Sequence, residues 1–313
     1  MSIFEEADAA LLPGFQRQFV DIDGAQVLAL TGGTGPALLM LHGDPQTHLC
    51  WHHIAPRLAE RFSVVLTDLR GRGETHKPGH AEGHDAYTKR QMAREQIAVM
   101  RALGHGTFAL VGHDRGARVA RRLALDHPQT VTHLAIMDII PALDFYEGLN
   151  AQIAQDYFYF SFLTQDYPIP DTLIGKNAEA FIRLILFGLV EEADCYDPLA
   201  LKAYLTAHIQ SASVTAMCEC FRAGYHIDQK HDAADRTSGK KIQCPTLVLW
   251  GQHGVVGRHF DVKSIWRGWC EHPQFTPMPS GHFIPEEAPE VAFNALNNFL
   301  RTRDLDQKNQ SQR

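Results

Sequence analysis

An aspartate stands at the tip of a turn that could hold a reactive side chain. Residues 108–111 form an apolar, β-type run, and the next turn has the pattern Gly-x-Asp-x-Gly over residues 112–116, with Asp114 at its centre. This pattern is typical of a nucleophile elbow, which exposes one side chain above a parallel sheet. A serine there attacks acyl carbons, whereas a carboxylate can displace a leaving group from an sp³ carbon and form an alkyl ester. Asp114 therefore predicts the opening of a carbon–halogen bond or of an epoxide.

A hydrolytic triad also needs an acid and a histidine, which follow the nucleophile along the chain in folds of this kind. His282 lies between the last predicted strand and the last predicted helix, which is the position expected for the triad histidine. Asp138 lies in the very apolar run 133–140, where a buried charge is costly unless it is paired. We therefore predict Asp138 as the orienting acid, with Asp261 as the second alternative.

Two arginines three residues apart follow the nucleophile. Arg115 and Arg118 lie on one side of the predicted helix, and forked guanidinium groups suit a carboxylate. We expect them to bind a substrate carboxylate; the alternative is ion pairing with Asp114 or solvation. Arg121 and Arg122, further along, are expected to form ion pairs or to be solvated.

Backbone N–H groups are expected to stabilise negative charge beside the nucleophile. One belongs to Arg115 at the start of a helix, where the helix dipole favours anions, and another belongs to Asp44 in the turn 42–45. The Asp44 carboxylate would repel a substrate anion unless it pairs with Arg115 or is protonated. It could equally point away, with only its N–H in use.

Alternating strands and helices position these residues. The pattern predicts an α/β fold with a mostly parallel sheet that is covered on both faces by helices. Strands are expected at residues 15–22, 25–31, 37–41, 63–69, 108–111, 133–140, 246–250 and 275–278, the first two joined as a hairpin. Helices are expected at 87–103, 116–125 and 285–303.

Residues 142–234 interrupt this alternation with several helical patterns and no convincing strand. We interpret them as a helical cap inserted into a core made of residues 1–141 and 235–313. Long insertions at the carboxyl ends of strands are where such folds place substrate pockets. The polar tail at 304–313 is expected to fray.

Composition narrows the class of protein. The chain has 313 residues, of which 45% are hydrophobic and 21% charged, which is ordinary for a globular protein. The net charge of −7 argues against a nucleic-acid or membrane partner, and no run approaches the ~20 apolar residues of a membrane span. We recognise no signal peptide and no Cys-x-x-Cys, so reduced cysteines and a cytoplasmic location are expected. We interpret His48, His52 and His53 as a polar helix face, because no carboxylate or cysteine completes a metal-ligand spacing.

Together these motifs resemble the haloacetate (fluoroacetate) dehalogenases of the α/β-hydrolase superfamily. The resemblance extends from about residue 15 to about residue 300, and its specific stretches are residues 41–48, 67–71, 111–118, 123–128, 138–141 and 281–283. It implies that Asp114 attacks the α-carbon of a 2-haloacid, and that His282, oriented by Asp138, activates the water that hydrolyses the resulting ester. It also implies that Arg115 and Arg118 hold the substrate carboxylate, that no cofactor is needed, and that the protein is a homodimer.

The predicted halide site departs from the family pattern. The family's cap offers a His-Trp pair and a tyrosine as donors to the leaving halide, and the matching residues here are Tyr159, Phe160 and Phe221. Two of the three donors are absent and the third is a phenol. Fluoride leaves poorly without strong donors, so we do not expect efficient defluorination, whereas chloride and bromide are compatible with Tyr159 and the backbone donors.

Two other functions fit parts of the sequence. An epoxide hydrolase uses the same Asp–His–Asp set, but the cap positions that carry its paired tyrosines match Phe158 and Phe221 here. Tyr157, Tyr159 or Tyr225 could replace them only from a different register. A small-molecule binding protein without turnover is the third possibility; the complete triad argues against it and the apolar cap argues for it.

Overall fold

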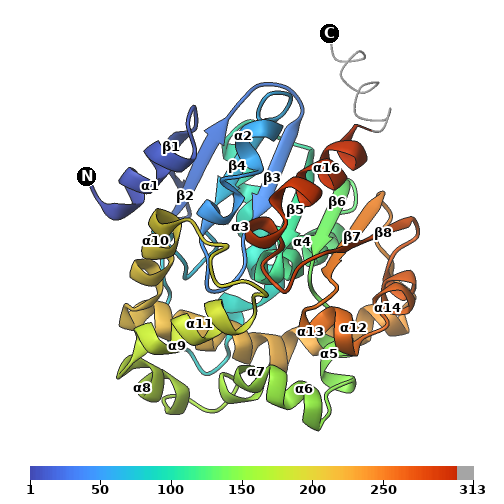
Figure 1. Cartoon of the computed structure of the whole chain (residues 1–313). Coiled ribbons are helices and arrows are strands. Elements are labelled where there is room, and N and C mark those ends of the chain that lie inside the picture. Colours follow the sequence, from blue (N-terminus) through green and yellow to red (C-terminus); the bar gives the residue numbers. More distant parts are fainter. Residues whose placement is uncertain (302–313) are drawn as a thin grey trace.

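One eight-stranded sheet organises the protein, and the computed structural model describes residues 1–301 (Figure 1). The strands follow the spatial order β1-β2-β4-β3-β5-β6-β7-β8; β2 pairs with β1 and β4 antiparallel, and all other neighbours are parallel. Their bounds are β1 (Gln16–Ile22), β2 (Ala25–Gly32), β3 (Ala37–Leu41), β4 (Ser63–Thr67), β5 (Phe108–His113), β6 (Val131–Met137), β7 (Thr246–Gly251) and β8 (Pro273–Met278). All eight predicted strands are confirmed, with ends that differ by a few residues.

The helices of the α/β core cover both faces of this sheet (Figure 1). Their bounds are α1 (Ile3–Leu11), η1 (His48–Trp51), α2 (Ala55–Leu58), η2 (Asp85–Tyr87), α3 (Lys89–Ala102), α4 (Asp114–Asp126), α13 (Val255–His259), α14 (Val262–Trp269), α15 (Ile284–Glu287) and α16 (Pro289–Leu300). The single helix predicted at 285–303 is wrong. The chain forms α15 and α16 with a break at Ala288 (φ −135°, ψ 50°), because Pro289 disfavours the helical conformation of the residue before it.

Between β6 and β7 the chain forms helices and no strand, within the described residues. These elements are α5 (Ala142–Glu147), α6 (Ala151–Asp156), α7 (Phe158–Phe162), α8 (Ile169–Gly175), α9 (Ala178–Gly188), α10 (Pro198–His208), α11 (Ser211–Ala223), the π-helix η3 (Gly224–Asp228) and α12 (Gln229–Thr237). We call them the cap. They lie below the carboxyl ends of the parallel strands in Figure 1. The predicted boundary at residue 234 falls inside α12.

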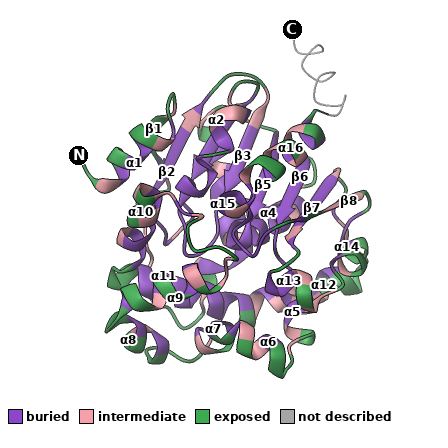
Figure 2. Ribbon diagram, viewed as in Figure 1, coloured by how far each residue is buried: buried purple, intermediate pink, exposed green. Residues whose placement is uncertain are grey.

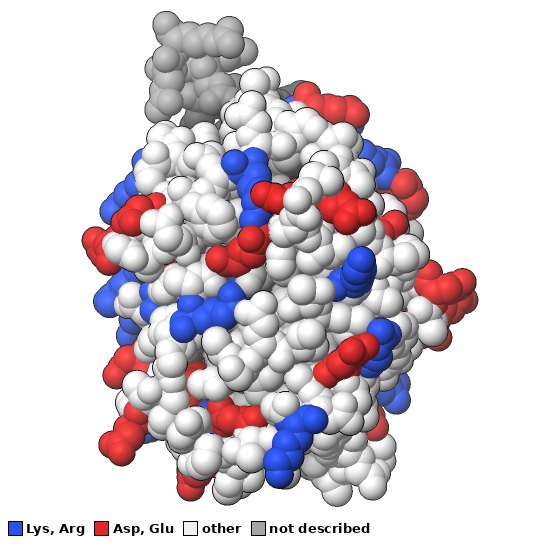
Figure 3. Space-filling model, turned by 90° about the vertical axis from the view of Figure 1, so that its left-hand side faces the viewer, with Lys and Arg blue, Asp and Glu red and all other residues white. Residues whose placement is uncertain are grey.

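Burial follows this layering. The central strands are buried on both faces, as expected for a parallel sheet between helices, and exposed residues gather on the outer faces of the helices (Figure 2). Basic and acidic side chains are interspersed on the face drawn in Figure 3, without a continuous area of one sign. None of the described helices combines the length and apolar character needed to cross a bilayer.

Two further sequence predictions concern cysteines and histidines. All six cysteines are free thiols, four of them buried. The interpretation of the histidine cluster as a polar helix face is wrong, because η1 and the turn after it bury His48 and His52 and expose only His53. His48 is hydrogen-bonded to Asp68 (2.8 Å) and Asp8 (2.7 Å). The predicted fraying of residues 304–313 concerns residues outside the described part of the chain.

Candidate active site

The sharp junction between β5 and α4 holds Asp114 in an uncommon backbone conformation. Its φ of 45° lies in the left-handed region, which is costly for a residue with a side chain and typical of a nucleophile elbow. Two glycines make the turn possible. A Cβ at Gly112 would lie 2.6 Å from the backbone of Ala117, and one at Gly116 would lie 2.3 Å from the carbonyl oxygen of Leu41. The helix begins at Asp114 itself, two residues before its predicted start.

Asp138 and His282 meet Asp114 at this junction. The Asp138 carboxylate accepts a hydrogen bond from His282 Nδ1 (2.6 Å) and another from the Gly251 N–H (2.9 Å). On the other side of the ring, His282 Nε2 lies 3.8 Å from Asp114 Oδ2. The alternative acid, Asp261, is exposed and accepts a hydrogen bond from the Ser264 N–H at the start of α14. The structure therefore brings together the three predicted triad residues and leaves Asp261 apart.

Electrostatics favour an ionised nucleophile and a basic histidine. Burial opposes the charge on Asp114, but the charges of Arg115 and His282 outweigh it and lower the pKa of Asp114 below its ordinary value. Burial also opposes the charge on His282, but the hydrogen bond with Asp138 and the charges of Asp138 and Asp114 raise the pKa of His282. The pair can therefore hold a negative nucleophile beside a histidine with a high affinity for a proton.

Further groups, which sequence reasoning missed, hold the loop of His282 in place. The Glu287 carboxylate accepts the N–H groups of Gly281 (2.9 Å) and Phe283 (2.8 Å), which flank the histidine. Burial lowers the pKa of His113 to about 3, and this neutral imidazole donates from Nε2 to the backbone oxygen of His282 (2.9 Å). The position of His113 directly before the nucleophile was the available signal for that contact.

The turn after β3 contributes a backbone donor, as predicted. The Asp44 N–H donates to Asp114 Oδ1 over 2.9 Å, so it can stabilise negative charge on that oxygen. The Asp44 side chain does not pair with Arg115 and is not neutral. It is bound by Arg72 through Nε and through Nη2 (2.5 Å), and although burial opposes its charge, Arg72 holds the pKa of Asp44 well below its ordinary range. Arg72, which the sequence analysis did not single out, thus neutralises a carboxylate that would otherwise repel an anionic substrate.

Arg115 and Arg118 are buried and short of partners. No described group forms a hydrogen bond with Nε or Nη2 of Arg115 or with Nε of Arg118. The Arg115 guanidinium lies 3.6 Å from the centre of the Phe221 ring, and its Nε lies 3.9 Å from Asp114 Oδ1. Burial and the charge of Arg115 lower the pKa of Arg118. Because buried guanidinium nitrogens without hydrogen bonds are costly, this arrangement fits an anion that is bound only during function.

The next turn of α4 carries two arginines that form hydrogen bonds with carboxylates, although Nε and Nη2 of Arg121 have no described hydrogen-bond partner. Arg121 Nη1 bonds to Asp232 Oδ1 (2.6 Å), and Arg122 bonds to Asp232 (2.9 Å), Asp235 (2.6 Å) and Asp126 (3.2 Å). Of the two alternatives predicted for Arg121 and Arg122, ion pairing or solvation, the structure shows ion pairing. Asp232 and Asp235 lie on α12, so these pairs hold the last cap helix against α4.

Two adjoining cavities surround the unpaired arginines. One lies above Asp114 and is lined by Asp44, Pro45, Asp114, Arg115, Tyr159, Ile185, Met217 and Phe221. The other lies along α4 and is lined by Arg115, Arg118, Tyr146 and Phe160, among others. Arg115 lines both cavities, so an anion held by both arginines would lie where they adjoin. Ile185 and Met217 had no sequence signal beyond their apolar character.

The cap supplies mostly apolar surface to the cavity above Asp114. Tyr159 and Phe160 on α7 and Phe221 on α11 are buried and form one aromatic cluster, with ring centres 5.1 to 6.0 Å apart. Tyr159 is the one phenol among the residues that line this cavity. Tyr157 packs its ring edge-on against His282 instead, while Phe158 is exposed. Of the predicted cap residues, Tyr159 and Phe221 therefore line the cavity above Asp114, and Phe160, packed against both, lines the adjoining cavity.

Comparisons with known proteins agree with this fold. The model of the α/β hydrolase fold family matches residues 36–176. The chain is 38% identical to fluoroacetate dehalogenase from Burkholderia sp, over 93% of this chain and 95% of that protein. It is 28% identical to soluble epoxide hydrolase from Corynebacterium sp. (strain C12), over 89% and 95%. Among solved structures, an α/β-hydrolase-fold protein from Nostoc sp PCC 7120 matches with a TM-score of 0.90 and 44% identity, over 92% of this chain and 98% of that one.

The parallel sheet, the elbow and the cap define an α/β hydrolase, and the named relatives are hydrolases. The family assignment rests on the match to the Burkholderia enzyme, which extends over nearly the whole length of both chains. The chain belongs to the haloacetate-dehalogenase-like family of α/β hydrolases.

Proposed function

We propose that this hydrolase converts a 2-haloacid into a 2-hydroxy acid and halide through an alkyl ester on Asp114. The observation that carries the proposal is a pair of buried guanidinium groups beside Asp114, with nitrogen atoms that form no hydrogen bond. A substrate that presents a carboxylate to Arg115 and Arg118 would place its α-carbon above Asp114. The Burkholderia relative, whose name gives fluoroacetate as its substrate, supports the same class of small acid.

In the first step, an Asp114 oxygen attacks the α-carbon while the carbon–halogen bond breaks and its electron pair leaves with the halide. Asp114 Oδ1 accepts the Asp44 N–H, so Oδ2 is the freer nucleophile. Arg115 balances the negative charge of the substrate carboxylate. Without Arg115, the substrate carboxylate and the Asp114 carboxylate would repel each other in a buried site.

In the second step, His282 takes a proton from a water molecule that attacks the ester carbonyl carbon of Asp114. Negative charge then develops on Oδ1, where the Asp44 N–H lies 2.9 Å away. Asp138 holds the ring with Nδ1 protonated and stabilises the imidazolium that forms. Collapse of the intermediate breaks the bond to the ester oxygen, which leaves as the hydroxyl of the 2-hydroxy acid with the proton held by His282. The second proton of the water remains on the Asp114 carboxyl group and is released to solvent, which restores the carboxylate.

The apolar cap bears on the choice of leaving group. Tyr159 is the single phenol that lines the cavity, and Phe160 and Phe221 offer no hydrogen-bond donor. Fluoride depends more on strong donors than chloride or bromide does. We therefore expect chloroacetate and bromoacetate to be turned over faster than fluoroacetate.

Epoxide hydrolysis is the second candidate, and the Corynebacterium relative favours it. It needs phenol donors above the nucleophile and no guanidinium pair, whereas the cavity above Asp114 has Tyr159 and Arg115, and Arg118 lines the adjoining cavity. A non-catalytic binder would need neither the triad nor its geometry.

The homodimer implied by the family resemblance is a separate proposal, which sedimentation analysis of the purified protein would test.

The decisive experiment compares substrates and traps the intermediate. Fluoro-, chloro- and bromoacetate and a few epoxides are incubated with the wild type, and halide release and diol formation are measured. His282→Asn, incubated with each active substrate, should accumulate the Asp114 ester, seen by intact-mass spectrometry and located by peptide mapping. Halide release with an adduct on Asp114 supports the proposal. Diol without halide would replace it with epoxide hydrolysis, and absence of any adduct would refute the two-step scheme.

A further inference from the structure

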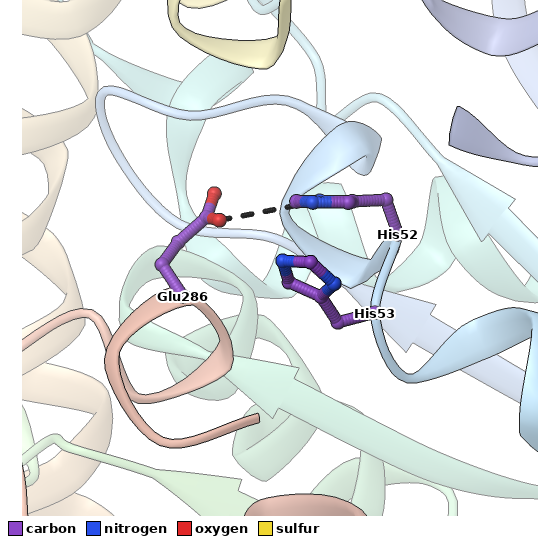
Figure 4. Close-up of side chains that lie close together, drawn as sticks. All are labelled: His52, His53 and Glu286. Carbon is purple, nitrogen blue, oxygen red and sulfur yellow. Dashed lines mark ion pairs between the residues drawn. The ribbon is translucent and has the colours of Figure 1, made fainter. Parts of the chain in front are cut away.

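Two neighbouring histidines and a distant glutamate converge beside η1, outside the cavity above Asp114. His52 and His53 follow η1 directly, and Glu286 lies on α15. Figure 4 shows both imidazole rings projecting toward the Glu286 carboxylate. One ring nitrogen from each histidine and one carboxylate oxygen lie within 4.8 Å of one another.

Two atoms of this trio are buried without hydrogen-bond partners. His52 donates from Nδ1 to the Leu49 carbonyl oxygen (2.8 Å), which leaves the lone pair of Nε2 unused. Glu286 Oε1 accepts from Tyr204 (2.6 Å) and Gln46 (3.0 Å), whereas Oε2 accepts nothing. Buried polar atoms are nearly always paired, so two orphaned acceptors in one cluster call for a ligand that accepts lone pairs.

The charge around the trio points the same way. Among residues 1–301, no lysine or arginine forms an ion pair with Glu286; its one ion-pair contact is with Nδ1 of His52, at 4.0 Å. Burial raises the pKa of Glu286 to about 8, so a divalent ion at Oε2 would displace a proton and balance the charge of the carboxylate that remains. Imidazole nitrogens together with a carboxylate oxygen suit Zn²⁺ and related transition-metal ions.

We propose that His52, His53 and Glu286 bind one divalent transition-metal ion such as Zn²⁺, with water completing the coordination. The hydrogen bond from His52 Nδ1 to a carbonyl oxygen and those from Tyr204 and Gln46 to Glu286 Oε1 are the supporting contacts that usually orient metal ligands. His53 is exposed, so the ion can enter from solvent. The imidazole ring of His53 is also free to rotate toward the bound ion. The bound ion would link the residues that follow η1 to α15, the helix that comes after the loop of His282.

A second trio provides an internal contrast. His80, His84 and Glu219 also lie within 4.8 Å of one another. Here both carboxylate oxygens are already used, Oε1 by His80 (2.9 Å) and Arg222 (2.8 Å) and Oε2 by His84 (2.9 Å). The Arg222 cation also repels a metal ion. This cluster is a hydrogen-bonded network, and we assign no metal to it.

The test is a Zn²⁺ titration of the chelator-treated, full-length protein by calorimetry, repeated with Co²⁺ by visible absorption. We expect a saturable equivalent in the wild type and in His80→Ala, and an affinity at least roughly tenfold weaker in His53→Ala. Because His53 is exposed, circular dichroism should show that His53→Ala is folded. Zn²⁺ should raise the melting temperature of the wild type more than that of His53→Ala.

Three outcomes would overturn the assignment. They are the absence of a saturable equivalent in the wild type, an unchanged affinity in His53→Ala, and a loss of binding in His80→Ala. Glu286→Gln serves as a second variant that removes the ligand charge at nearly constant volume. If it folds by circular dichroism and still binds Zn²⁺ as tightly as the wild type, Glu286 is not a ligand and the site is refuted.

Discussion

The core wall and the cap wall of the cavity above Asp114 differ in what they offer a substrate. On the core side, Asp138, His282 and the Asp44 N–H form a connected set of short hydrogen bonds and close polar contacts around Asp114. On the cap side, the surface is aromatic or aliphatic, and Tyr159 contributes the one phenol. In the proposed mechanism, the core therefore carries the groups that make and hydrolyse an ester, whereas the cap affects which leaving group departs.

A second contrast lies within helix α4. Arg121 and Arg122 are matched by the carboxylates of α12, while Arg115 and Arg118, one turn earlier, stack near aromatic rings without carboxylate hydrogen bonds. The arginines of α4 thus have different surroundings, although they are the same residue type on one helix. We attribute a structural role to the paired arginines and a ligand-binding role to the unpaired ones.

The largest effect is expected on the core wall, at the nucleophile. Asp114→Asn should lower haloacid turnover by about a thousandfold or more, because an amide oxygen is a far weaker nucleophile than a carboxylate. Steady-state halide release measures the loss, and Asp261→Asn, an exposed carboxylate outside the triad, is the matched control. Activity near that of the wild type in Asp114→Asn would remove the basis of the contrast between core and cap.

The next largest effect is expected on substitution of an arginine that lacks hydrogen-bond partners. Arg118→Gln should raise KM for haloacids by roughly ten- to a hundredfold, the value of a charge-assisted hydrogen bond to a carboxylate. Arg121→Gln should instead lower the melting temperature with little change in KM, because it breaks a buried ion pair with Asp232. Equal changes in KM for the two variants would contradict the division of roles along α4.

The pH dependence tests the core wall again. His282 must be neutral to accept a proton from water, and its pKa is raised by Asp138 and Asp114, although burial opposes this. Turnover should therefore fall about tenfold per pH unit once the pH drops below that raised pKa, and should be full above it. Asp138→Asn should lower turnover and move the acidic limb to lower pH. If the acidic limb of the pH–rate profile does not move in Asp138→Asn, Asp138 does not set the pKa of His282.

The smallest effect is expected on the cap wall. Phe221→Tyr adds one phenol to the cavity and should raise halide release from chloroacetate several-fold, about the value of one hydrogen bond of ~1 kcal/mol. Tyr159→Phe should lower it by a similar factor. An unchanged or lower rate in Phe221→Tyr would favour a substrate without a halide.

Local sequence was enough for much of the fold and for the position of the triad. The elbow at Asp114 follows from glycines that only a tight strand–helix turn requires, and Asp138 stood out because its charge interrupts an apolar run. The break at Ala288 was also local, since Pro289 disfavours the helical backbone before it, but the amphipathic pattern across it suggested one helix. Helix α1 was missed, although Ser2 and Glu5 form a capping box there.

What the sequence determined by itself was the α/β-hydrolase fold with an aspartate at the elbow, because residue type and backbone conformation at the elbow are set by neighbours along the chain. What only the tertiary structure decided was the pairing of charges. Arg72 reaches Asp44, the carboxylates of α12 select Arg121 and Arg122 over Arg115 and Arg118, and Glu286 meets two histidines from the far end of the sequence. Such pairs depend on distances across the fold, and electrostatic energies change with separation and burial, which residue order does not encode.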